Sequence, residues 1–135
     1  MPYLMIAGNR DGGGAYPVQG LQLLNKGVGP AFIQSVRIRY QDTLYEQDPP
    51  RFYFSNVKPP DSVDYSINNA SISLGYVVSA GEQLLLIEPN SEYSASVINE
   101  LFFGDNRAIA EITYSSIYDE VWQVSNEKYV PEKID

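Results

Sequence analysis

Two closely spaced pairs of carboxylates are the residues of this sequence best suited to acid–base chemistry. Asp61 and Asp64 follow two prolines, and Asp119 and Glu120 are adjacent in a polar stretch. Two carboxyl groups about 5 to 10 Å apart across a cleft can hydrolyse a glycosidic bond. Adjacent residues of a strand point to opposite faces, so the second pair could act together only if a turn bends both side chains inward. We interpret both pairs as acids of solvated turns.

The 135 residues contain no histidine and no cysteine. This composition excludes histidine-dependent triads, imidazole metal ligands, thiol nucleophiles, disulfides and thiolate zinc sites. Catalysis could then come only from carboxylates, lysine, tyrosine or serine, without a side chain that ordinarily titrates near neutral pH. We therefore predict that the protein is not an enzyme and that it has no catalytic, cofactor-binding or metal-binding residues.

The charge is unevenly distributed along the chain. The formal net charge is -8, with a balance of +2 over residues 1–58 and of -10 over residues 59–135. An acidic chain without a concentrated basic face is a poor ligand for phosphates, so nucleic acid is excluded as a partner. Arg37 and Arg39 form a candidate interaction patch for the acidic surface of a protein partner or of a second copy.

These arginines stand in "LQLLNKGVGPAFIQSVRIRY", residues 21–40, which consists of two alternating apolar stretches around a loop. The loop is predicted to be a structural turn, in which Gly27 and Gly29 adopt positive φ and Pro30 fixes the exit. A phosphate-binding role for the glycines lacks the helix and the Lys-Ser/Thr pair that phosphate loops require.

The second stretch has the period-two pattern of a half-buried antiparallel strand. Its outer face carries the two arginines. Its inner face is predicted to comprise Phe32, Val36, Ile38 and Tyr40.

The aromatic run Phe52, Tyr53 and Phe54 lies in a segment with paired prolines near both ends, residues 49–61. Proline cannot donate to a strand ladder, so this segment is predicted to cross between sheets or to cover an end of the barrel, while the aromatics anchor it. An exposed sugar-stacking platform is the alternative interpretation.

Further strands follow from alternating or continuous apolar residues bounded by turn residues. They are expected within residues 67–78, 84–88, 108–118 and 121–125. In the first of these, one parity is apolar and should face inward: Ile72, Leu74, Tyr76 and Val78. Trp122, in the last, is predicted to be a core residue or to plug one end of the sandwich.

One helix is predicted near residues 92–103, with Asn90 or Ser91 as its cap and Gly104 as its end. Short strands at intervals of about ten residues favour an all-β chain, an immunoglobulin-like antiparallel β-sandwich of seven to nine strands. Residues 1–135 show no internal boundary and are predicted to form a single β-sandwich domain.

Three stretches carry a resemblance to a known group of proteins: "LLNKGVGPAFI", "AGEQLLLIE" and "ITYSSIYDEVW". The first resembles the N-x-G-x-G-P-A strand-turn-strand motif of uncharacterised bacterial extracytoplasmic β-sandwich domains, which often follow a membrane helix. The resemblance implies an immunoglobulin-like fold in the periplasm or at the cell surface. Contact with a membrane is expected only through a segment absent from this chain.

Three classes of function remain. The first is a non-catalytic extracytoplasmic interaction or structural module of a membrane-anchored protein or larger assembly, with protein binding or self-association. The alternative is a carbohydrate-binding module that uses tyrosine and tryptophan faces. The third is a carboxylate-based hydrolase.

Overall fold

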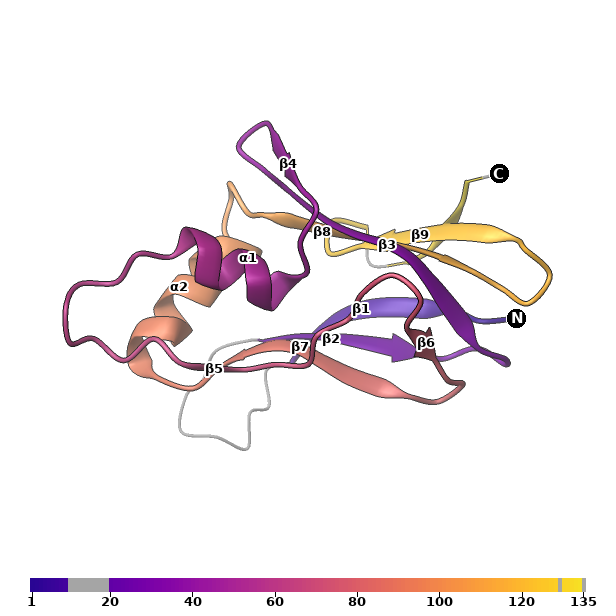
Figure 1. The fold of residues 1–135 in the computed structure, drawn as a ribbon, viewed down its shortest axis with the longest axis horizontal. Helices are drawn as coiled ribbons and strands as arrows, with labels where there is room; N and C mark the ends of the chain where they lie inside the picture. Colours follow the sequence, from indigo (N-terminus) through magenta and orange to yellow (C-terminus); the bar gives the residue numbers. More distant parts are fainter. Residues whose placement is uncertain (10–19, 129, 135) are drawn as a thin grey trace.

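The computed structural model describes residues 1–9, 20–128 and 130–134. Within these residues the chain forms ten β-strands in two antiparallel sheets and two α-helices. Figure 1 shows the helices together at one end of the molecule and both ends of the chain at the other. The mostly β architecture predicted from the sequence is confirmed, and it is compatible with a sandwich.

The smaller sheet has four strands in the order β1-β2-β7-β5. Its members are β1 (Leu4–Asn9), β2 (Gly20–Asn25), β7 (Gln83–Pro89) and β5 (Ile67–Asn68). β7 is an inner strand of this sheet, as its continuous apolar sequence predicts.

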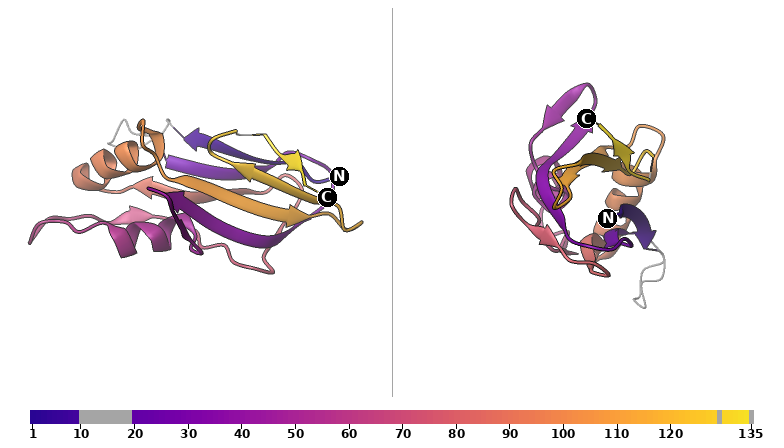
Figure 2. Two further views of the ribbon diagram at one scale, coloured as in Figure 1. Left: turned by 90° about the horizontal axis from the view of Figure 1, so that it is seen from above. Right: turned by 90° about the vertical axis from the view of Figure 1, so that its right-hand side faces the viewer.

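The larger sheet has the order β10-β9-β8-β3-β4, and β6 also pairs with β3. Its members are β10 (Glu132–Lys133), β9 (Val121–Ser125), β8 (Ile109–Ser115), β3 (Ala31–Tyr40), β4 (Thr43–Tyr45) and β6 (Val77–Val78). β3 and β4 are joined through Gln41 and Asp42, both with positive φ, which is the backbone of a two-residue hairpin. The two sheets lie over one another in Figure 2 and enclose the apolar core.

Helix α2 (Glu92–Phe103) occupies the predicted residues. Ser91 is the N-cap and forms a capping box with Ser94, and Gly104 follows the last turn. Ile98 and Phe102 are fully buried, because their spacing of four places both on the face that packs on the sheets.

Helix α1 (Pro49–Asn56) was not predicted. Its N-cap is Asp48, and the two prolines that suggested irregular structure occupy the first helical positions. Proline is favoured there because its missing N–H is one that no helical carbonyl would accept. Phe52 and Tyr53 are fully buried while Phe54 is 47% exposed, so two of the three aromatics anchor this helix to the core.

The predicted inner face of β3 is wrong in its first half. Ala31 and Ile33 are buried, whereas Phe32 is only partly buried. The register of β3 against β8 shifts between Ile33 and Ser35. An extra residue at such a bulge reverses the parity of the side chains, and Ile38 beyond it is buried as expected.

The strand predicted within residues 67–78 is present only at its two ends, as β5 and β6. Ile72 and Val78 are buried, but Leu74 is 73% exposed. The turn at Gly75, whose φ is +91°, breaks the alternation between them. Trp122 is partly buried against the core rather than enclosed in it.

Raising the pH above 10 is expected to destabilise the fold through Tyr53. Its buried hydroxyl donates to the carbonyl of Tyr65 at 2.8 Å, and burial, followed by the nearby Tyr93, Tyr65 and Asp64, raises the pKa of Tyr53 to about 12. Between pH 10 and 12 the unfolded chain releases this proton first, so stability present below pH 10 is lost as pH rises. The loss from Tyr53 should be about 2 kcal/mol between pH 9 and 11.5.

Urea unfolding at a series of pH values measures this dependence. Tyr53→Phe should flatten the alkaline slope, although it also removes the hydrogen bond to Tyr65. Tyr118→Phe is the matched control, because Tyr118 is 78% exposed. Equal alkaline slopes in wild type and Tyr53→Phe would refute a coupling between this hydroxyl and folding.

Candidate functional site

The loop between β2 and β3 is a structural turn in which the two glycines have different roles. Gly29 has a φ of +98°, as predicted. Gly27 does not have positive φ, so that part of the prediction is wrong. It is needed because a Cβ there would overlap the carbonyl oxygen of Met1 and lie 2.5 Å from the amide nitrogen of Tyr3. Pro30 leads from the loop directly into β3.

Asn25, at the end of β2, is the residue of this turn that sequence reasoning missed. It is 1% exposed. Its Oδ1 accepts from the amides of Tyr3 and Gly27 at 3.2 and 3.1 Å. Its Nδ2 donates to the carbonyls of Gly29 and Val78, both at 3.0 Å. The asparagine two residues before Gly27 was the available signal, since Asn side chains commonly bond to nearby backbone in turns.

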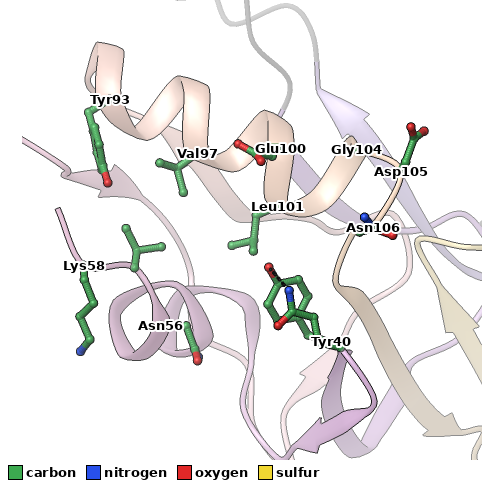
Figure 3. A pocket seen from close by; sticks show the side chains of 12 residues that line it. Tyr40, Asn56, Lys58, Tyr93, Val97, Glu100, Leu101, Gly104, Asp105 and Asn106 are labelled. Carbon is green, nitrogen blue, oxygen red and sulfur yellow. Dashed lines mark hydrogen bonds between the residues drawn. The ribbon is translucent and has the colours of Figure 1, made fainter.

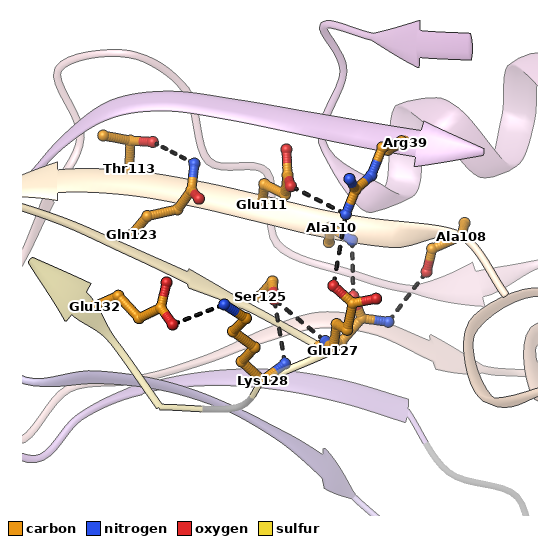
Figure 4. A network of polar contacts seen from close by, with 11 residues as sticks. Arg39, Ala108, Ala110, Glu111, Thr113, Gln123, Ser125, Glu127, Lys128 and Glu132 are labelled. Atoms are coloured by element: carbon orange, nitrogen blue, oxygen red, sulfur yellow. Dashed lines mark hydrogen bonds and ion pairs between the residues drawn. The ribbon is translucent and has the colours of Figure 1, made fainter. Parts of the chain in front are cut away.

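Arg39 lies in a network of charges within the same chain (Figure 4). Its guanidinium is 3.3 Å from a carboxylate oxygen of Glu111 and 3.6 Å from one of Glu127. Beside it, Lys128 pairs with Glu132 at 2.7 Å. Exposed ion pairs of this kind contribute little stability, but the two carboxylates reduce the positive charge that Arg39 offers to a partner.

Arg37 faces different surroundings from Arg39. It lines a groove of about 420 Å³ along β3, whereas Arg39 lines a separate hollow with Glu111 and Glu127. We call the groove that Arg37 lines the edge groove. It is formed by three segments, residues 34–37 of β3, residues 46–51 at the start of α1, and residues 71–74. Arg51 lines it as well, so two arginines from separate elements share the groove.

Two side chains that line the edge groove, Arg37 and Gln47, each carry a buried polar atom without a hydrogen-bond partner in the described part of the chain. These atoms are the Nε of Arg37 and the Oε1 of Gln47. The amide nitrogen of Gln47 is engaged, because it donates to the Ser55 hydroxyl at 3.2 Å. Buried polar atoms are costly to leave unpaired, so this pair of atoms marks the groove as a candidate binding surface.

Asp48 holds two walls of the edge groove together. Its Oδ1 accepts from the amide of Arg51 at 3.1 Å and its Oδ2 from the amide of Ile72 at 3.2 Å. Both carboxylate oxygens are therefore used by the protein itself. Glu46 is exposed at the rim, so the groove presents two guanidinium groups and one carboxylate to the solvent.

A third hollow, of about 530 Å³, lies between the two helices. Figure 3 shows Val97 and Leu101 projecting from α2 into it, with Tyr93 beside them. Tyr40 lines the hollow from the end of β3, and Asn56 from the last turn of α1. This interhelical pocket is lined by both apolar and polar side chains.

The two acidic pairs lie in turns. Asp64 accepts from the amide and the hydroxyl of Ser66 at 3.0 and 2.7 Å, and these bonds, the hydroxyl first, lower the pKa of its carboxyl. Asp119 has a φ of 62°, and Glu120 is 3.5 Å from the Lys133 ammonium. Among the described residues no three acidic side chains gather closely enough to hold a metal ion.

No protein-family model, curated protein or solved structure matches this chain. No helix within the described ranges is both long enough and apolar enough to cross a membrane. Function is therefore inferred from the geometry of the candidate sites alone.

Proposed function

We propose that this chain is a non-catalytic interaction module with an immunoglobulin-like sandwich fold. The order of strands supports the fold. β1-β2-β7-β5 in one sheet and β9-β8-β3-β4 in the other correspond to the A-B-E-D and G-F-C-C′ orders of immunoglobulin domains. Such sandwiches carry many unrelated functions, so the function is argued from the surface.

An extracytoplasmic location belongs to the same proposal. It is supported by the resemblance of the loop around Gly27 and Gly29 to the motif of extracytoplasmic sandwich domains. Both ends of the chain lie opposite the helices (Figure 2). Attachment to a membrane-anchored protein or a larger assembly through either end would leave the helical end free to meet a partner.

The observation that carries the interaction proposal is the unpaired Arg37 Nε and Gln47 Oε1 in the edge groove. Arg37 belongs to the patch predicted from sequence, and Arg51 adds a second positive charge from α1. Two arginines suit a carboxylate-bearing protein surface, since guanidinium groups match carboxylates in geometry and charge. The partner is an acidic protein surface, with self-association through the acidic part of a second copy as one form of it.

Binding to immobilised polyglutamate, with sedimentation equilibrium for self-association, tests this proposal. We expect weak polyglutamate binding at 20 mM NaCl that falls about threefold or more at 300 mM NaCl, because salt screens exposed charges. The double variant Arg37→Ala and Arg51→Ala should lose the binding. Arg39→Ala is the matched control and should retain it, because Arg39 is already paired with Glu111 and Glu127. Equal binding by the double variant and wild type would contradict the proposal.

A carbohydrate-binding module is the second candidate, and the interhelical pocket favours it. The phenols of Tyr40 and Tyr93 lie there with the amide of Asn56 and the carboxylate of Glu100, which are the groups that stack on and hydrogen-bond to sugars. The leading proposal predicts no binding to a broad glycan panel. Micromolar binding to a defined oligosaccharide that is lost in Tyr93→Ala would replace it with this second candidate.

A further inference from the structure

We propose that the edge groove binds an extended peptide segment of the partner, which adds as a strand to the free edge of β3. This inference rests on the proposed function and specifies that the partner binds through an extended segment. Strand addition of this kind combines main-chain hydrogen bonds with pockets for alternate side chains.

The free edge is the side of β3 that faces away from β8. At one end of β3, Ala31 and Phe32 pair with β6, and Ile33 exchanges hydrogen bonds with Tyr76 and Gly75. At the other end, β4 pairs with residues 38–40. Residues 34–37 have no strand partner on this side within the described chain. Figure 1 shows β4 and β6 against different ends of β3, with α1 nearby.

The unpaired stretch of β3 is as long as a short extended segment. Four strand residues span about 13 Å. In an antiparallel ladder, alternate residues direct both backbone groups to the same edge. The two-residue hairpin makes Tyr40 and Thr43 a hydrogen-bonded pair, and Ile38 with Tyr45 the next one. Counting back by two places Val36 as the following residue whose backbone faces the groove.

The unused atoms beside this edge match a peptide group. A peptide unit offers one carbonyl acceptor and one N–H donor. The Arg37 Nε is an unpaired donor and the Gln47 Oε1 an unpaired acceptor, both buried, on two side chains that line the same groove. A simple anion would satisfy the arginine and leave the glutamine oxygen unpaired, so the pair favours a peptide over an inorganic anion.

The charges of the groove specify a single acidic side chain in the bound segment. Arg51 and Arg37 can meet one carboxylate, whereas the exposed Glu46 at the rim opposes a second. Because Asp48 already ties the start of α1 to Ile72, the walls are held before a peptide arrives. A preformed groove reduces the ordering cost of binding.

The probe is a seven-residue acetylated and amidated peptide of alternating threonine and valine with one central glutamate. Its binding to the full chain is measured by fluorescence anisotropy, with expected dissociation constants on the order of 100 µM. Hydrogen exchange of the Val36 amide should slow in the complex. A peptide with N-methylated backbone positions on alternate residues should bind at least about tenfold more weakly, because it cannot donate to a strand edge.

The substitution Arg37→Lys tests whether binding needs the guanidinium group or only its positive charge. Lysine keeps the positive charge but has no Nε donor of this geometry, so peptide affinity should fall by about fivefold. Arg39→Lys is the matched control on the same strand and should bind as wild type does. Circular dichroism verifies that both variants are folded.

Failure of this inference and failure of the proposed function give different results. Equal binding of the N-methylated and unmodified peptides, or no peptide binding at 1 mM, would overturn strand addition. If strand addition is overturned but arginine-dependent binding to polyglutamate persists, the proposed function stands without strand addition. Loss of arginine dependence in the polyglutamate assay as well would overturn both.

Discussion

Replacing Asn25 by alanine is expected to lower the free energy of unfolding by about 3 to 5 kcal/mol. The substitution removes four hydrogen bonds and leaves the amides of Tyr3 and Gly27 and the carbonyls of Gly29 and Val78 without their partner. Each ordinary hydrogen bond contributes about 1 kcal/mol, and a buried group left unpaired costs more. Urea unfolding followed by tryptophan fluorescence measures the change.

Asn56→Ala is the matched control for this prediction. Asn56 is also a side-chain amide, but it makes one hydrogen bond, from its Nδ2 to the carbonyl of Phe52 at 3.0 Å. Its loss should cost about 1 kcal/mol or less. If the two variants were equally stable, Asn25 would not be the link between the first strand, the turn and β6.

Replacing Gly27 by alanine is expected to cost about 2 to 4 kcal/mol, more than the same change at Gly29. The new Cβ at Gly27 would meet backbone atoms of Met1 and Tyr3, which cannot move without β1. At Gly29 the nearest atom is 3.9 Å away, so alanine there should cost about 1 to 2 kcal/mol, chiefly from the positive φ.

Hydrogen exchange shows where the damage at Gly27 occurs. The amides of Lys26 and Val28 donate to the carbonyls of Tyr3 and Met1 at 2.9 and 2.8 Å. Gly27→Ala should remove their protection while the β3–β8 amides keep theirs, since those lie in the other sheet. A larger loss of stability in Gly29→Ala than in Gly27→Ala would show that backbone conformation, and not close approach, governs this loop.

If these two predictions hold, the N-x-G-x-G-P-A motif is a structural device. It fixes the first strand against the turn, and it lies away from the edge groove, whose three segments do not include it. The motif therefore relates to the fold and not to the partner. The chemistry of the partner is inferred from the residues of the edge groove.

Local signals in the sequence were sufficient for much of the architecture. Period-two patterning located β2, β3 and β8 because each has one face on the core. Helix α2 was predictable from Ser91, Gly104 and helical spacing, all within one short segment. Where local signals were ambiguous, the prediction was wrong: prolines can exclude a strand or begin a helix, and α1 shows the second use.

Only the tertiary structure decided the inner face of β3 and the composition of the edge groove. The bulge after Ile33 arises from pairing with β8, so no property of β3 alone reveals it. Arg37, Gln47 and Arg51 come from a strand, a connecting segment and a helix, and Asp48 joins them to Ile72, 24 residues away. The sequence by itself determined the strands, α2 and the absence of histidine and cysteine chemistry, because these depend on composition or on neighbouring residues. Which polar atoms meet, and which remain unpaired, depends on contacts between distant segments that only folding brings together.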